Sequence, residues 1–495
     1  MTDLNPRIRQ LEDIPAFDLE HDVVVCGYGG AGASAAYEAR KAGANVLVLE
    51  RASQGGGSTA MSSCEMYLGG SGGTRLQQEL GFTDTTENMI AYLTECFGPS
   101  GDPERIRIYA EGAAEHFDWA ESLGVTYKRA VLLEREVVPL SDESLLFTGN
   151  ERVYPFTEKA DPVPRGHVPS AEGDFGGQIL MGALMRQVEA LGAKITCDAD
   201  VKSLVQDSAG RVHGVIARID GKDTAIRARK GVILTMGGFC FNEEMTRKHL
   251  PYLRQVSAPY GNPWDKGAGI LLGQAAGGNP INMSEAFIGL AFYPPAQLTY
   301  GIFVNQQGQR FVNEDSYLAR MAAYAANQPD CRIYLFVQNE DFEPSLYLQR
   351  LPIVGTGDTP AEAAEEAGLP VEAFEQTLAF YNKHAATGSD PLFHKAKNWL
   401  KPIDKPPYAI VSYSFEDLHS PVSDEVGPPL FTLGGLDVRP TGEVLTVDGE
   451  IIPGLYAAGR TVAGLPRTAQ GYASGMSVGD ATFFGRLAGR QAADQ

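Results

Sequence analysis

The chain has 495 residues, of which 43% are hydrophobic and 21% charged, and its formal net charge is −21. This composition is typical of a globular protein, and the length favours two domains because a single hydrophobic core rarely serves so many residues. Nucleic acid and anionic membrane surfaces are excluded as partners, since both require a basic surface that neutralises phosphate.

The sequence also gives no indication of a metal site or of a membrane-bound protein. The six cysteines are scattered without a C-x-x-C pair, so we predict no metal. No apolar run approaches the roughly 20 residues of a membrane-spanning helix, and the first residues have no signal-peptide pattern. We therefore expect no membrane span and a cytoplasmic protein with reduced thiols.

The first predicted elements form a β–α–β unit. Residues 22–26 are an apolar, β-branched run that is typical of a buried parallel strand, and a glycine-rich turn follows directly at 27–32. A helix of small residues is predicted over 33–42, and a second buried strand over 45–49. This order of elements predicts an α/β fold that begins with a doubly wound, Rossmann-type domain.

The later elements divide the chain into a nucleotide-binding domain and an insertion. Between about 276 and 431 aromatic residues and prolines become more frequent and the spacing irregular, which indicates a second, smaller domain. The predicted domains are therefore 1–275 and 432–495 for the nucleotide-binding domain and 276–431 for the insertion. The remaining predicted elements are a helix over 178–191, strands over 194–205, 211–218 and 231–236, a helical segment over 360–383, a strand over 454–459 and a closing helix over 475–491.

The glycine pattern of the first unit predicts a dinucleotide site. Gly27 permits the tight turn, Gly29 lets backbone N–H groups approach a pyrophosphate, and Gly32 lets the helix pack on the sheet. The helix N-terminus stabilises the phosphate charge. Glu50 ends the second strand, where a carboxylate accepts hydrogen bonds from a ribose diol.

Later glycine-rich stretches favour FAD over NAD. The run 55–59 follows the second strand, and strands that end at Gly237 and Gly459 come much later. Contacts spread along the chain suit a long cofactor that lies extended across a domain, although such glycines also occur in structural turns. The predicted cofactor contacts are Gly27, Gly29, Gly30, Ala31, Gly32, Glu50, Arg51, Gly57, Ser58, Thr59, Val201, Gly237, Gly459, Ser477 and Val478.

Taken together, these segments resemble a known family. The resemblance covers nearly the whole chain and rests on the runs 27–32, 50–51, 56–59, 311–314, 432–435 and 454–460. It is a resemblance to the flavoprotein family of fumarate reductases and 3-ketosteroid dehydrogenases. The family fold is a Rossmann-type FAD-binding domain interrupted by a smaller α+β substrate-capping domain, in agreement with the predicted organisation.

Within this family the chain is more similar to the 3-ketosteroid Δ4-(5α)-dehydrogenases than to the fumarate reductases. Phe431 stands where the fumarate reductase branch has a histidine, and Tyr472 falls at the position of its catalytic arginine. The steroid branch has a tyrosine at the position of Tyr317 and a Gly-Tyr-Ala-Ser-Gly run, which is present here at 471–475. No histidine lies near 55–62, so the resemblance implies FAD that is held without a covalent bond.

The resemblance implies desaturation next to a ketone, in which a proton leaves the α carbon and a hydride passes from the β carbon to FAD. It assigns carbonyl activation and proton abstraction to Tyr317 and Tyr472, with help from Ser474 and the Gly475 backbone N–H. Which tyrosine is the base stays open, and Tyr324 is the rival for the role of Tyr317. The expected partners are a small hydrophobic substrate, a 3-keto-5α-steroid, and an unidentified electron acceptor.

Two alternatives remain open from the sequence. Arg467 lies in a loop, 461–470, that is longer than in the steroid branch. Arg467 is either a solvated loop residue or a substrate-binding residue. In the second case the protein would be an ene-reductase or desaturase of the same family, and Arg467 would hold its carboxylated or non-steroid substrate. The other alternative is a flavin-binding electron-transfer or regulatory subunit without a substrate of its own.

Overall fold

The computed structural model describes residues 7–137, 141–172, 175–348, 350–419 and 425–495. Within them, nine strands form one large mixed sheet around which the cofactor segments are arranged. The strands lie in the order β1 (Arg7–Gln10), β9 (Asp200–Gln206), β10 (Val212–Ile219), β11 (Lys222–Leu234), β2 (Leu19–Cys26), β3 (Val46–Leu49) and β8 (Lys194–Thr196), while β22 (Ile451–Ala457) pairs with β11 and β21 (Glu443–Leu445) with β22.

The long strand β11 joins segments that are distant in the sequence. Its first half pairs with β10, and its last residues pair in parallel with β22, where Val232 lies opposite Leu455. Along its other edge β11 pairs in parallel with β2, and β2 with β3. These central strands are buried on both faces, which explains their uninterrupted apolar runs. The C-terminal segment therefore belongs to the same sheet as the glycine-rich β–α–β unit.

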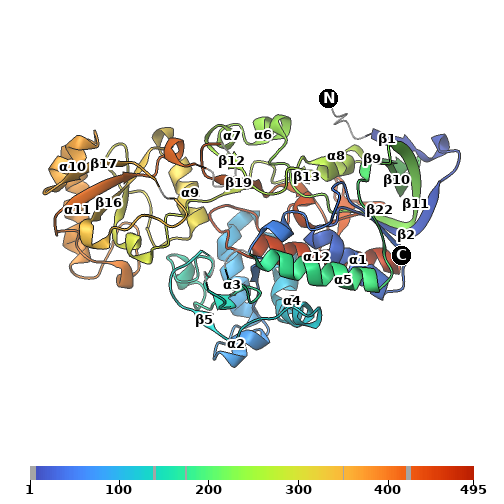
Figure 1. Ribbon diagram of the computed structural model, residues 1–495, viewed down its shortest axis with the longest axis horizontal. Helices are drawn as coiled ribbons and strands as arrows, with labels where there is room; N and C mark the ends of the chain where they lie inside the picture. The colour runs from blue at the N-terminus through green and yellow to red at the C-terminus, as the bar shows by residue number, and fades with distance from the viewer. Residues whose placement is uncertain (1–6, 138–140, 173–174, 349, 420–424) are drawn as a thin grey trace.

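Three helices pack side by side near the centre of the molecule (Figure 1): α1 (Gly30–Lys41), α5 (Gly176–Ala190) and α12 (Met476–Asp494). Helices α1 and α12 approach closely because small residues line their contact. A Cβ atom on Gly485 would lie 2.6 Å from the Ala31 carbonyl oxygen, and one on Gly489 would lie 2.2 Å from that of Ala35. The close packing brings α12 against the helix that follows the glycine-rich turn.

A separate lobe lies at the opposite end of the molecule from the main sheet (Figure 1). It holds a four-stranded antiparallel sheet with a hydrophobic core of its own, which includes Phe336 and Phe374. The sheet order is β15 (Ile302–Asn305), β16 (Ile333–Gln338), β18 (Tyr408–Ser412) and β17 (Ile353–Gly357), and α10 (Pro360–Glu366) and α11 (Val371–Ala385) contribute to the same core.

The chain enters and leaves this lobe through paired strands. Strand β13 (Pro280–Ile281) pairs with β20 (Gly435–Leu436), and β14 (Ala286–Ile288) pairs with β19 (Pro429–Thr432). Strand β12 (Ala258–Pro259) also pairs with β19. The two connections thus run next to each other, which supports the proposed insertion of a domain between 276 and 431. Before them lie α6 (Glu243–His249), α7 (Leu253–Val256) and α8 (Ala268–Ala275), and α9 (Leu318–Ala326) lies inside the insertion.

A third lobe, which the sequence did not predict, lies beneath the three central helices in the view of Figure 1. Its four strands have two residues each, too few for an alternating pattern to be visible in the sequence. The sheet order is β4 (Met66–Tyr67), β7 (Gly166–His167), β6 (Leu145–Leu146) and β5 (Val131–Leu132), and the lobe includes α2 (Arg75–Glu79), α3 (Thr86–Phe97) and α4 (Pro103–Ser122).

Three predicted elements were wrong in their extent. The strand predicted over 231–236 is the last part of β11, which begins at Lys222 and ends at Leu234. The strand predicted over 194–205 is divided into β8 and β9, because Asp198 has a positive φ of 52° and turns the chain between them. The helix predicted over 360–383 is divided into α10 and α11 at Gly368, with φ 69°, and Pro370. None of the helices in the described ranges has both the length and the apolar character needed to cross a bilayer.

Candidate active site

The glycines of the turn after β2 differ in what the chain itself requires of them. A Cβ atom on Gly27 would lie 2.4 Å from the Thr235 carbonyl oxygen, and one on Gly32 would lie 2.0 Å from the Gly27 carbonyl oxygen, so the fold itself requires these two glycines. At Gly29 the nearest atom to a Cβ would be the Gly57 Cα at 3.7 Å. Packing within the chain therefore does not require glycine at position 29. A pyrophosphate at the N-terminus of α1 does require it, because a side chain would keep the backbone N–H groups away from the phosphates.

The carboxylate at the end of β3 is held in a fixed orientation. Glu50 accepts hydrogen bonds from the N–H groups of Tyr28 and Ala52, each at 2.8 Å. The Ala199 N–H donates to the Glu50 carbonyl oxygen at 2.9 Å, which brings the start of β9, with Val201, next to Glu50. An oriented carboxylate with remaining acceptor capacity suits a ribose diol, so these residues fit the nucleoside end of a dinucleotide.

Arg51 and the following loop continue the site. The Arg51 guanidinium lies 4.3 Å from the ring centre of Trp264 and 3.6 Å from the Asp200 carboxylate. Further along the loop, the Gly30 N–H donates to Thr59 Oγ1 at 3.3 Å. The loop 55–59 is thereby fixed against the first turn of α1, and the contact of its residues with a cofactor stays a prediction.

The three glycine-containing stretches meet at one buried ion pair. Ser58 Oγ donates to Asp265 Oδ2 at 3.0 Å, and Arg460 donates to Ser58 Oγ at 2.7 Å and forms an ion pair with Asp265. A Cβ atom on Gly237 would lie 2.0 Å from Asp265 Oδ1. Gly459, next to Arg460, has a positive φ of 64° and packs against Ala31. The sequence did not indicate Asp265, since a single aspartate outside any motif carries no signal.

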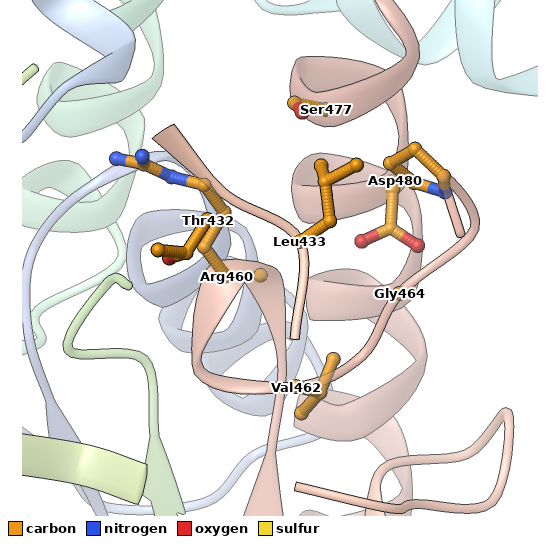
Figure 2. A pocket seen from close by; sticks show the side chains of 9 residues that line it. Thr432, Leu433, Arg460, Val462, Gly464, Ser477 and Asp480 are labelled. Atoms are coloured by element: carbon orange, nitrogen blue, oxygen red, sulfur yellow. The ribbon is translucent and has the colours of Figure 1, made fainter. Parts of the chain in front are cut away.

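Arg460 also lines a pocket against the start of α12, shown in Figure 2. Thr432 and Arg460 lie on one side of the pocket, Ser477 and Asp480 project from α12 on the other, and Leu433 stands between them (Figure 2). The pocket lining consists of Thr432, Leu433, Gly459, Arg460, Val462, Gly464, Pro466, Ser477 and Asp480. Arg460 thus contacts Ser58 and lines the pocket that Ser477 also lines, and an extended dinucleotide that passes these three residues stays a prediction.

Tyr472 lies beside this pocket, at the N-terminus of α12. Its hydroxyl donates to Ser477 Oγ at 3.0 Å. Its ring packs against Phe287 and Phe431, with ring centres 4.9 and 5.6 Å away. Burial raises the pKa of Tyr472 to about 12, although its hydrogen bonding with Ser477 and the charge of Arg460 oppose this rise. The phenol therefore keeps its proton at neutral pH and is a hydrogen-bond donor.

Tyr317 reaches the same region from the inserted lobe. It stands at the N-cap of α9, where its N–H donates to Asn150 Oδ1 at 2.8 Å, and its hydroxyl lies 2.6 Å from Ser474 Oγ. Burial, followed by the charge of Glu65, raises the pKa of Tyr317 well above its ordinary value. Tyr324, the rival in the sequence, packs 5.0 Å from the Arg320 guanidinium on α9.

The segment that holds Ser474 is fixed to the third lobe. The Ser474 N–H donates to the Thr148 carbonyl oxygen, and Thr148 Oγ1 donates to the Ser474 carbonyl oxygen, both at 2.9 Å. Gly475 has a positive φ of 92°, and a Cβ atom there would lie 2.7 Å from the Tyr67 nitrogen. Asn150 and Thr148 were not predicted, because they belong to the lobe that the sequence did not reveal.

Arg467 is buried among charges of the chain itself. Its side chain is only 9% exposed, so the alternative of a solvated loop residue is wrong. Its Nε donates to the Gly464 carbonyl oxygen at 2.8 Å, and its guanidinium lies 4.0 Å from the Asp102 carboxylate. Burial and the nearby Arg105 lower the pKa of Arg467, against the opposing charges of Asp102, Asp437 and Asp480. A contact of Arg467 with substrate stays a prediction.

Comparisons with known proteins show the family to which the chain belongs. A model of the FAD binding domain matches residues 22–476. The solved structure of 3-ketosteroid-Δ4-(5α)-dehydrogenase from Rhodococcus jostii RHA1 in complex with 4-androstene-3,17-dione is 40% identical, covers 99% of this chain and 100% of that chain, and has a TM-score of 0.91.

Among curated proteins, 3-oxo-5-alpha-steroid 4-dehydrogenase of Comamonas testosteroni is 28% identical over 88% of this chain and 92% of its own length. NADH:fumarate oxidoreductase of Klebsiella pneumoniae is also 28% identical, over 96% of this chain. The chain spans 48% of the length of that relative. Vinyl phenol reductase of Lactiplantibacillus plantarum is 25% identical over 96% of this chain and 96% of its own length, so likeness over full length extends beyond the steroid enzymes, and the 40% identity to the Rhodococcus jostii structure is the higher one.

Proposed function

Because the chain belongs to the FAD-binding flavoprotein family that contains the fumarate reductases and the 3-ketosteroid dehydrogenases, we propose that it is a 3-ketosteroid Δ4-(5α)-dehydrogenase. It introduces a C=C bond next to the ketone of a 3-keto-5α-steroid. The observation that carries this proposal is the pair of phenols, Tyr317 from the insertion and Tyr472 from the segment before α12, whose hydroxyls contact Ser474 and Ser477 of the same segment. The full-length likeness to the Rhodococcus jostii enzyme supports the same reaction.

FAD is the cofactor that the residues fit. Gly29 leaves space for the pyrophosphate, Glu50 offers acceptors to the ribose, and Ser58, Arg460 and Ser477 continue the site towards the phenols. Bound FAD would supply the hydride acceptor for the β carbon of the substrate. The protein contributes binding, orientation and a site shielded from water.

Tyr472 is the donor to the substrate carbonyl in this proposal, and on substrate binding its hydroxyl proton turns from Ser477 Oγ to the carbonyl oxygen. Its phenol is protonated at neutral pH, and the Arg460 guanidinium and the N-terminus of α12 lie next to it. Both provide a positive field, which stabilises the negative charge that develops on the carbonyl oxygen as the α proton leaves. The Gly475 N–H, at the same helix end, is the second donor of this oxyanion site.

Tyr317 and Ser474 together accept the α proton. Their oxygens are 2.6 Å apart, which is within the range of a strong O–H···O hydrogen bond. Ser474 Oγ receives the proton from the α carbon while its own proton passes to the Tyr317 phenolate, so no free serine alkoxide forms. Proton abstraction is thereby assigned to Tyr317 and Ser474, and carbonyl activation to the Tyr472 hydroxyl and the Gly475 N–H.

The proposal is tested by anaerobic addition of a neutral 3-keto-5α-steroid to the FAD-loaded protein. We expect the yellow flavin absorbance to bleach and the steroid to lose two hydrogen atoms, with the enone absorbance of a Δ4-3-ketone. If the photoreduced protein is instead reoxidised by fumarate, and saturated ketosteroids leave the flavin yellow, the assignment to the steroid branch is refuted.

We further propose that FAD is held without a covalent bond. Residues 51–66, which include the loop 55–59, contain no histidine, and the buried His116 and His167 are hydrogen-bonded to Thr482 and Thr74 at 2.8 and 2.7 Å. Acid precipitation should release all flavin into the supernatant as FAD. Yellow colour that stays with the precipitated protein would contradict this proposal.

A further inference from the structure

One turn of the third lobe, residues 148–150, contacts the segments of both Tyr317 and Ser474. Thr148 forms two hydrogen bonds with the Ser474 backbone, each at 2.9 Å. Two residues further on, Asn150 Oδ1 accepts a hydrogen bond from the Tyr317 N–H at 2.8 Å. Thr148 and Asn150 are both fully buried. The two hydroxyl groups that lie 2.6 Å apart therefore belong to segments that are held by the same turn.

Side chains, rather than a helix or strand, hold this turn in place. The Gly149 N–H donates to Glu151 Oε2, and the Asn150 N–H donates to the Tyr92 hydroxyl, both at 2.9 Å. Glu151 and Tyr92 are each only 1% exposed, so water does not compete for these hydrogen bonds. On the other side, a Cβ atom on Gly149 would lie 2.5 Å from the Ala473 Cβ, which means that the turn packs directly against Ala473. The turn is thus fixed from both sides.

The same lobe also fixes the chain just before Tyr317. The Arg135 guanidinium donates to the carbonyl oxygens of Glu314 and Ser316. These contacts locate the backbone that enters α9, whereas the Tyr317 N–H lies beyond them and is bound by Asn150. Because Tyr317 stands at the N-cap, outside the helical hydrogen bonds of α9, a rotation of its peptide would move the phenol relative to Ser474.

We propose that Asn150 is a positioning residue of the reaction: through the Tyr317 N–H it orients the phenol towards Ser474, and Thr148 orients Ser474 in the same way. Proton abstraction requires this because two oxygens must be aligned with each other and with the α carbon, and a misplacement of about 1 Å can cost about a hundredfold in rate. The inference rests on the proposed function and adds to it the part of the chain that aligns the two proton-accepting groups.

The test measures whether Asn150 acts through Tyr317. Asn150→Ala should lower the limiting rate of flavin reduction by a 3-keto-5α-steroid about tenfold or more, with the FAD content and the apparent steroid affinity nearly unchanged. In the Tyr317→Phe background the same substitution should cost less than about twofold, because no phenol is left to align. In the Tyr472→Phe background it should keep its full cost. A merely structural role gives the same cost in all three backgrounds, and that result overturns the inference.

Asn305→Ala is the matched control. Asn305 is also a buried asparagine, and its Oδ1 accepts the N–H groups of Gln307 and Gln309 at 3.0 Å in the turn after β15. This variant should keep the wild-type rate. Thr148→Val is a second, nearly isosteric variant that removes only the donor to the Ser474 carbonyl oxygen. Its cost should vanish in the Ser474→Ala background, and an equal cost there contradicts the inference.

Hydrogen exchange gives a readout that needs no substrate. In Asn150→Ala the Tyr317 amide loses its acceptor, so the peptide that contains it should exchange faster than in the wild type, whereas Asn305→Ala should leave it unchanged. If no ketosteroid bleaches the wild-type flavin, the proposed function fails and exchange alone decides on the positioning of Tyr317. Faster exchange then supports a positioning contact of Asn150, and unchanged exchange overturns it.

Discussion

The hydroxyl of Tyr317 lies 2.6 Å from the Oγ of Ser474, although the two residues are 157 positions apart in the sequence. Tyr317 comes from the inserted lobe and Ser474 from the segment that precedes α12. The contact between Tyr317 and Ser474 therefore exists only when the inserted lobe is packed against the FAD-binding domain. Any motion that separates the two lobes would disconnect the proposed proton acceptor.

The first prediction concerns the three hydroxyl groups of the site. Tyr317→Phe, Tyr472→Phe and Ser474→Ala should each lower the rate of flavin reduction by about a hundredfold or more, which is the usual contribution of a positioned acid or base. FAD content should stay unchanged in each variant. Tyr324→Phe is the matched control, because Tyr324 packs on Arg320, and it should keep the wild-type rate. Stopped-flow reduction under anaerobic conditions measures the effect.

The second prediction concerns pH. The pKa of Tyr317 is raised, so the phenol is protonated at neutral pH and loses its proton only as the pH rises. Below that pKa the phenolate fraction grows about tenfold per pH unit, and the rate of flavin reduction should increase with pH in the same way. Tyr472→Phe should lower the rate and keep this slope, whereas Tyr317→Phe should remove it. The reverse result would exchange the roles of the two tyrosines.

The third prediction separates the two uses of glycine in the turn after β2. Gly29→Ala should weaken FAD binding about tenfold or more, a loss of about 1.4 kcal/mol or more, and leave the thermal stability of the apoprotein unchanged, since its Cβ would come no closer than 3.7 Å to the chain. Gly27→Ala should destabilise the apoprotein itself, because its φ is 106° and its Cβ would lie 2.4 Å from the Thr235 carbonyl oxygen. Flavin fluorescence titration and thermal unfolding measure the two effects.

The fourth prediction concerns the buried ion pair of the third lobe. Arg165 binds both oxygens of Asp84 at 2.7 Å, and both side chains are fully buried. Asp84→Asn should lower the free energy of unfolding by about 3–5 kcal/mol, because it leaves a buried guanidinium without its counter-charge. Asp118→Asn, in the exposed pair with Arg75, is the control and should change stability little. Denaturant unfolding of the two variants should differ clearly, and equal midpoints would contradict the prediction.

Local patterns in the sequence were enough for the FAD-binding unit. The apolar runs of β2 and β3, the glycines between β2 and α1, and the acid at the end of β3 all lie within 22–50, and the structure has each of them where predicted. Backbone conformation and burial on both faces impose these patterns on residues that are adjacent in the sequence. The patterns can therefore be recognised from the sequence alone. Motif position likewise indicated Tyr317, Tyr472 and Ser474, and the structure brings them together; their catalytic roles stay a prediction.

Tertiary structure alone decided the surroundings of these residues. Asp265 joins Ser58 to Arg460, and Thr148 and Asn150 fix the segments of Ser474 and Tyr317, through contacts that no local pattern encodes. The environment of Arg467 was equally hidden, because its neighbours come from positions 102, 105, 437 and 480. The sequence by itself determined the cofactor type and the hydroxyl groups at the site. The packing of distant segments determined the hydrogen-bond partners, the charged neighbours and the burial of these hydroxyl groups, because all three depend on which segments of the chain pack together and exclude water.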